Sequence, residues 1–117
     1  IVPGETDQGI HVERLSVSAS TASTYVIEAT LIQVAERPSI VSGSVRLEIQ
    51  GTQNGEAVRL MTADLGGAPT NLDFRFRYFQ ALEQTVELPT EFTPSRIKVA
   101  VIGKKGTPVE AEFVWPA

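Results

Sequence analysis

The segment Ser44–Leu60 reads SVRLEIQGTQNGEAVRL, and it determines the expected fold class. Val45, Leu47 and Ile49 alternate with polar residues, which gives an extended segment one apolar face and one polar face. The dipeptide Asn54–Gly55 follows, and both residues tolerate the positive φ angles that a type I′ turn requires. The alternation resumes beyond the turn. The segment therefore predicts an antiparallel hairpin with one buried face.

The same period-two alternation recurs along most of the chain, with turn residues roughly every ten positions. The other expected strands are Ile10–Ser18, Thr24–Val34, Asn71–Gln80, Thr85–Pro89, Arg96–Ile102 and Val109–Pro116. No segment carries a long apolar stripe of helical period, and Phe79–Thr85 is expected to form one helical turn at most. This pattern predicts an all-β fold: an antiparallel β-sandwich, immunoglobulin-like, with about seven or eight strands. A partly open β-barrel is the alternative.

The chain of 117 residues is short enough to be one domain. We expect residues 1–9 to be the end of a linker and residues 10–117 to form the single domain, because IVPGETDQG has the composition of a connecting segment. The final hairpin, Arg96–Trp115, is expected to supply central core, with Trp115 packed near Phe76.

Composition and charge exclude several classes of function. The net charge is −4, which opposes general affinity for phosphate backbones, so no nucleic-acid partner is expected. The chain has no cysteine, which excludes disulfides and thiol chemistry. No apolar run reaches the roughly 18 residues of a membrane span, so this piece is not expected to enter a membrane.

The aromatic and arginine-rich segment Asn71–Gln80 reads NLDFRFRYFQ and could be a stacking face or a core strand. Alternation assigns one side to Leu72, Phe74, Phe76 and Tyr78, and the other side to Asp73, Arg75, Arg77 and Phe79. The rings and the cations therefore face apart, whereas a nucleic-acid platform needs them to face the ligand together. This separation favours a core strand.

Phe79 is the aromatic residue of this segment that falls on the charged side, beside Arg77. It is expected either to cover one end of the sandwich or to anchor a partner, since Phe and Arg suit interface hot spots. We expect the partner-binding residues to be Phe79, Phe92 and Arg77, with both phenylalanines at one loop end.

No arrangement of residues supports catalysis, a cofactor or a metal, and we expect the protein not to be an enzyme. His11 is the single histidine and lies within an expected strand. Asp64 and Asp73 flank one loop but are only two acids, too few for a calcium loop. The remaining carboxylates mostly occupy the polar faces of expected strands.

A glycan-binding module is the alternative function. It needs three or more aromatic side chains exposed on one flat face. Of the eight aromatic residues, Tyr25, Phe79 and Phe92 lie outside the expected apolar faces, and they are scattered in the sequence.

Several segments together resemble a known family. They are SGSVRLEIQGTQNGEAVRL, LDFRFRYFQALEQTVELPTEFTPSRIKVAVI and VEAEFVWP, within Val41–Pro116. The chain resembles the C-terminal β-rich domain of an uncharacterised family of proteobacterial envelope proteins, which have one membrane span and a coiled coil. The resemblance implies a location at the periplasmic face of the inner membrane, and it transfers no functional residues.

The predicted function is therefore a non-enzymatic protein-interaction or scaffolding domain of a membrane-anchored envelope protein. Its expected partner is another protein of the cell envelope, bound either along an exposed sheet edge or at a loop end. A preceding coiled coil would also allow the full-length protein to form a homodimer.

Overall fold

The structure, a computed structural model, describes residues 9–65, 72–105 and 107–116. These residues form eight β-strands and one short 3₁₀ helix. In chain order the elements are β1 (Ile10–Ala19), β2 (Thr24–Gln33), β3 (Val41–Gln53), β4 (Glu56–Met61), η1 (Thr62–Asp64), β5 (Asp73–Phe76), β6 (Phe79–Glu87), β7 (Phe92–Gly103) and β8 (Val109–Val114).

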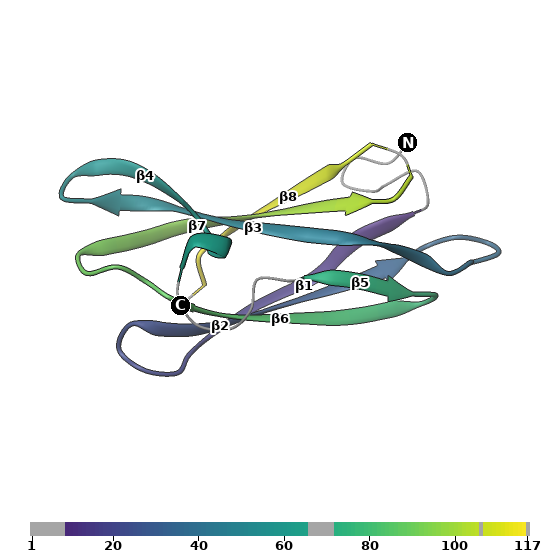
Figure 1. Cartoon of the computed structure of the whole chain (residues 1–117), viewed down its shortest axis with the longest axis horizontal. Helices are drawn as coiled ribbons and strands as arrows, with labels where there is room; N and C mark the ends of the chain where they lie inside the picture. The colour runs from purple at the N-terminus through teal and green to yellow at the C-terminus, as the bar shows by residue number, and fades with distance from the viewer. Residues whose placement is uncertain (1–8, 66–71, 106, 117) are drawn as a thin grey trace.

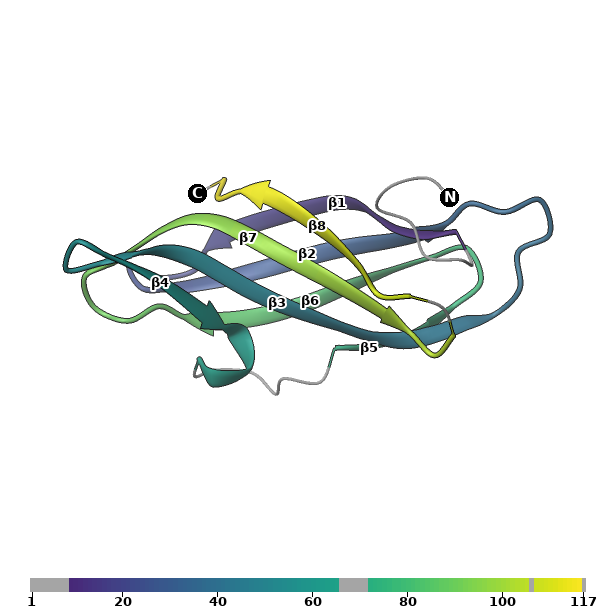
Figure 2. The same cartoon turned by 90° about the horizontal axis from the view of Figure 1, so that it is seen from above.

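The strands make two antiparallel sheets that lie one over the other (Figures 1 and 2). The smaller sheet has the order β1-β2-β6. The larger sheet has the order β4-β3-β7-β8, and β5 also pairs with β3. The sheets are not closed into a barrel, which confirms the predicted β-sandwich and makes the barrel alternative wrong.

The strand order is that of an immunoglobulin-like sandwich. In such folds the first, second and fifth strands share one sheet, and the third, sixth and seventh share the other. Here β1, β2 and β6 correspond to the first set, and β3, β7 and β8 to the second, with β4 extending the second sheet beside β3. The short strand β5 pairs with the opening residues of β3.

The hairpin between β3 and β4 forms as the sequence predicts. Gln53 pairs with Glu56, so Asn54 and Gly55 are the two residues of the turn. Their φ angles are 52° and 81°, which confirms a turn with both central residues in the left-handed region, as type I′ requires. The turn fixes the register, and the register directs every second side chain of both strands into the core.

The core lies between the sheets and consists of the alternating residues that the pattern predicts. Leu47, Ile49, Val99 and Val101 are almost fully buried. On β8, Val109 and Phe113 pack against the core, and the glutamates between them face outward. Burial of each large side chain stabilises the fold by roughly 1.5–3 kcal/mol, so the two apolar faces account for the layered architecture.

The prediction that Asn71–Gln80 is one strand is wrong. The structure divides its described residues into β5, which ends at Phe76, and β6, which begins at Phe79. The chain changes sheets at Arg77 and Tyr78, because β5 pairs with β3 and β6 pairs with β2. The Tyr78 side chain is 62% exposed instead of buried.

The expected helical turn over Phe79–Thr85 is also wrong, because these residues belong to strand β6. Leu82, Gln84 and Val86 point into the core, while Glu83 is exposed. The side chain of Gln84 is 1% exposed, and its Nε2 and Oε1 atoms make no hydrogen bond. A polar residue at an inward position disrupts the period-two pattern, which is why a single helical turn was expected there at most.

Trp115 does not pack near Phe76. Its ring makes an edge-to-face contact with Tyr25, with centroids 5.4 Å apart, and so joins the two sheets. Phe76 pairs with Val41 at the beginning of β3, whereas the Trp115 amide bonds to Ser95, close to the other end of that strand. The final hairpin does supply central core through Ile97, Val99 and Val101 of β7, as expected, whereas its second strand β8 is an edge strand.

Candidate functional site

Exposed apolar side chains gather at one end of the sandwich. Among the described residues, four of the six large hydrophobic side chains that are exposed belong to this group: Val34 (57%), Ile40 (42%), Tyr78 (62%) and Phe79 (69%). They come from the β2–β3 connection and the β5–β6 turn, which lie at the same end of the molecule (Figures 1 and 2). We call these four residues the apolar end. Clustered exposure of this kind marks an interaction surface more than scattered single residues do.

Gln33, the last residue of β2, holds the apolar end together. Its backbone N–H donates to the Tyr78 carbonyl at 3.0 Å. Its side-chain Nε2 donates to the carbonyls of Ser39 at 2.8 Å and Arg77 at 2.6 Å. The three bonds connect the two segments that carry the exposed apolar residues, so the surface is fixed by hydrogen bonds.

Phe79 continues the apolar end onto the outer face of the smaller sheet. It lies directly opposite Ile32 on β2, and Ile32 lies opposite His11 on β1. The three residues form one cross-strand row whose side chains point away from the core, because Ile10 and Leu31 beside them point inward. The row adds an aliphatic and an imidazole side chain to the surface next to Phe79.

Two of the three residues expected to bind a partner lie in this region. Phe79 and Arg77 are exposed and lie at this end of the sandwich. Sequence reasoning missed Val34, which it placed at the end of an expected strand, and Ile40, which lies between expected strands, and it assigned Tyr78 to the core. The alternation gives no signal of the turn between Phe76 and Phe79, which takes Tyr78 out of the strand pattern.

The placement of Phe92 in an exposed loop is wrong. Phe92 is the first residue of β7, is 8% exposed and belongs to the core. It pairs with Gln53 at the far end of β3, whereas Phe76 pairs with Val41. Twelve residue steps along a strand span about 40 Å, so Phe92 and Phe79 lie at opposite ends and cannot form one site.

A bulge in β7 explains the burial of Phe92. Gln50 pairs with Arg96 and Gly51 with Pro94, so Ser95 is the extra residue. The extra residue reverses the alternation, and Phe92 therefore points inward like Ile97 further along. A Cβ atom on Gly51 would lie 2.8 Å from the Phe92 ring, so the ring occupies the space that a glycine leaves.

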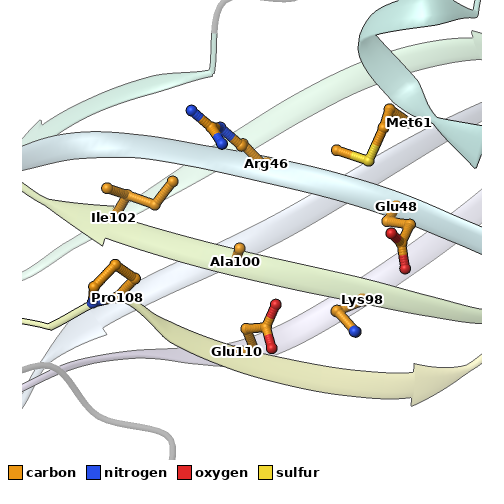
Figure 3. A pocket seen from close by; sticks show the side chains of 8 residues that line it. All are labelled: Arg46, Glu48, Met61, Lys98, Ala100, Ile102, Pro108 and Glu110. Carbon is orange, nitrogen blue, oxygen red and sulfur yellow. The ribbon is translucent and has the colours of Figure 1, made fainter.

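The outer face of the larger sheet carries an open depression of about 470 Å³ (Figure 3). Ala100 forms its floor, and side chains of both charges surround it: Arg46, Glu48, Lys98 and Glu110. Glu48 and Glu110 lie on β3 and β8, with Lys98 on the strand between them. The carboxylates do not converge, and the arrangement is that of a solvated sheet face.

The described residues contain no group of three His, Asp or Glu side chains that could hold a metal ion. Asp64 lies in η1 and Asp73 begins β5. The loop between these two acids falls outside the described residues. That the two acids are too few to bind calcium therefore stays a prediction from the sequence. Across 9–65, 72–105 and 107–116 there is also no helix with the length and hydropathy of a membrane span.

A solved DNA glycosylase structure shows a likeness in fold to this chain. The alkylpurine DNA glycosylase AlkC of Pseudomonas fluorescens, bound to DNA containing an abasic site analog, is 18% identical with a TM-score of 0.52. The match covers 95% of this chain and 31% of the glycosylase chain, so this chain spans about a third of that protein. At this identity the likeness shows the fold alone.

The second structure, Northeast Structural Genomics Consortium target SoR45, is 16% identical and has a TM-score of 0.38. The match covers 94% of this chain and 89% of that chain. At this TM-score no structural conclusion is drawn from the likeness. No curated protein matches the chain.

A family model matches residues 1–99, which is most of the chain. Its description is a family of unknown function (DUF6776). The match is consistent with the expected relationship to an uncharacterised family, and it also covers the first forty residues. The chain belongs to this family of unknown function, DUF6776.

Proposed function

We propose that the chain is a non-enzymatic protein-interaction domain that binds its partner through the apolar end. The observation that carries the proposal is the concentration of exposed apolar side chains at one end of an otherwise well-packed sandwich. Leaving Tyr78 and Phe79 in water forgoes burial worth roughly 1.5–3 kcal/mol for a side chain such as Phe, and a partner would supply that burial. Arg77 beside them adds a cation suited to interface recognition.

We further propose that this domain belongs to a membrane-anchored protein of the bacterial envelope and acts on the periplasmic side. The resemblance to envelope proteins with a coiled coil supports this location and a scaffolding role. The partner would then be another envelope protein, and a coiled coil preceding the domain would present two copies of the apolar end.

The exposed aromatic residues do not favour the glycan alternative. All eight aromatics lie within the described residues, and only Tyr78 and Phe79 are exposed. Adjacent positions near a strand start cannot present the three coplanar rings that a flat glycan platform needs.

Affinity capture with matched baits tests the proposed function. The baits are the native chain, a Tyr78→Ser/Phe79→Ser variant, and a Met61→Ser/Val114→Ser variant that removes exposed apolar side chains elsewhere. Because interface aromatics often contribute 2 kcal/mol or more, the first variant is expected to retain its partner at least about tenfold more weakly. The second variant should behave like the native chain. A partner retained equally by both variants would contradict the proposal, and so would failure of the native bait to retain any protein.

A further inference from the structure

Strand β6 forms a long edge of the smaller sheet. It pairs with β2 over nine consecutive residues, Phe79 to Glu87, without a register shift. Within the described residues β2 is its only strand partner. The other side of β6 is therefore an edge at which backbone groups are available to another strand.

The alternation of hydrogen-bonded pairs between β2 and β6 identifies which backbone groups of β6 face the free edge. The Gln33 N–H donates to the Tyr78 carbonyl, and the Leu88 N–H donates to the Ser23 carbonyl. Hydrogen-bonded pairs alternate in an antiparallel ladder, so even-numbered residues of β6 bond to β2. The backbone groups of the odd-numbered residues point away from β2. These residues are Phe79, Ala81, Glu83, Thr85 and Glu87.

The other edges are shorter or irregular. Strand β1 has a bulge between Val12 and Arg14, and β4, β5 and β8 have six, four and six residues. Natural edges are protected by lysines, prolines, bulges or short length. Strand β6 has no lysine, no proline and no bulge, so among these edges it is the one best suited to accept a strand.

The charged residues that β2 and β6 place on the outer face beside this edge are all acidic, and Arg14 on β1 lies opposite Thr30 in the neighbouring row. Glu28 on β2 lies directly opposite Glu83 on β6, and Thr24 lies opposite Glu87. Glu28 and Glu83 form a non-hydrogen-bonded pair, in which Cβ atoms lie about 4.5–5.5 Å apart and like charges destabilise the sheet. Neither carboxylate forms an ion pair with a described residue; Arg96 and Glu112 form theirs on the other sheet. A cation next to Glu83 would relieve the repulsion.

We propose that the β6 edge accepts an extended segment of a partner protein as an added antiparallel strand. The segment carries an apolar side chain next to Phe79 and a lysine or arginine next to Glu83. This inference rests on the proposed function for the apolar end, because Phe79 belongs to both surfaces. It adds the class of partner: a basic, extended polypeptide recognised by strand addition.

A second copy of this chain fits the edge less well. None of the odd-numbered residues of β6 is a cation, so pairing β6 with itself brings no positive charge to Glu28 and Glu83. Pairing centred on Glu83 would instead place two further like charges opposite each other. Charge complementarity therefore selects a different, basic strand.

Amide hydrogen exchange of the whole chain tests the free edge. The N–H groups of Ala81, Glu83 and Thr85 are expected to exchange much faster than those of Leu82 and Gln84, because only the latter bond to β2. Equal protection along the strand would show that the edge is already covered and would overturn the inference.

A nine-residue peptide, acetyl-KTVTKTVTV-amide, is the binding probe. In antiparallel pairing its two lysines lie opposite Glu87 and Glu83, and its final valine lies opposite Phe79. Added to the native chain, it should slow exchange of the odd-numbered amides of β6 at least about tenfold. The control peptide, with both lysines replaced by glutamate, should not.

Two variants separate strand addition from other binding. Ala81→Pro removes an edge-facing N–H without removing a bond to β2, and it should abolish the effect of the peptide. Glu83→Lys reverses the charge at an exposed position and should weaken binding at least about tenfold, whereas Glu110→Lys on β8 should not. Thermal unfolding checks that each variant is folded. If Ala81→Pro does not fold, Glu83→Lys still tests the proposal.

The outcomes distinguish this inference from the proposed function. No protection by the lysine peptide up to about 1 mM, or protection at residues outside β6, would overturn strand addition. Peptide-induced oligomerisation with β8 or β4 protected would also overturn it. If Ala81→Pro still captures the partner while Tyr78→Ser/Phe79→Ser does not, the result supports binding through the apolar end and overturns strand addition at the β6 edge.

Discussion

Phe92→Ala is expected to lower the free energy of unfolding by about 3–5 kcal/mol, the range for truncating a buried phenylalanine. Phe92 is 8% exposed and packs in the core against Gly51, where a lost ring leaves a cavity that the backbone cannot close. Urea denaturation followed by tryptophan fluorescence measures the change. A decrease of this size is a large fraction of the free energy of unfolding of a small domain.

Phe79→Ala is the matched control, because it makes the same substitution at a residue that is 69% exposed. Its expected effect on the free energy of unfolding is within about 0.5 kcal/mol. The two results together would separate the core phenylalanine from the surface phenylalanine. Equal effects of the two substitutions would contradict the bulge at Ser95 and the inward orientation of Phe92.

Gln84→Met is expected to raise the free energy of unfolding by about 1–3 kcal/mol. Gln84 is buried in β6, and its side-chain amide makes no hydrogen bond. The substitution keeps the length of the side chain and removes two polar atoms whose desolvation is not compensated. Thermal unfolding should show a melting temperature several degrees higher.

Gln80→Met, on the same strand, is the control and should have the opposite sign. The Gln80 Oε1 atom accepts a hydrogen bond from the Arg75 N–H at 2.8 Å, so its loss leaves a backbone donor without its partner. A Gln84→Met chain that is no more stable than the native one would show that the Gln84 amide is satisfied in solution.

Period-two alternation was sufficient to predict the sandwich, because the side chains of β3, of β8 and of β7 beyond its bulge obey it. It could not reveal the crossover at Arg77 and Tyr78. Even-numbered residues point inward on both sides of the turn, as Phe76 and Leu82 do, so the pattern shows no break. The strand pairing that separates β5 from β6 is a tertiary property, invisible to a local pattern.

The candidate site was only partly predictable for a related reason. Phe79 and Arg77 were recognisable because Phe79 falls on the charged side of the alternation. Val34 and Ile40 reach the same surface through the β2–β3 connection, and the hydrogen bonds of Gln33 bring that connection beside Tyr78. Phe92 was misplaced because the expected strand began only at Arg96: the bulge at Ser95 interrupts the alternation there, and a bulge has no dependable signal in a single sequence.

Site-specific photo-crosslinking in the native host tests directly whether the apolar end is the interaction surface. Benzoylphenylalanine would replace Phe79 in one chain and Val114 in another, since the two side chains are 69% and 68% exposed but lie on different parts of the sandwich. We expect a discrete adduct with a second protein from position 79 and none from position 114. No adduct from position 79, or the same adducts from both positions, would contradict the assignment of the apolar end as the interaction surface.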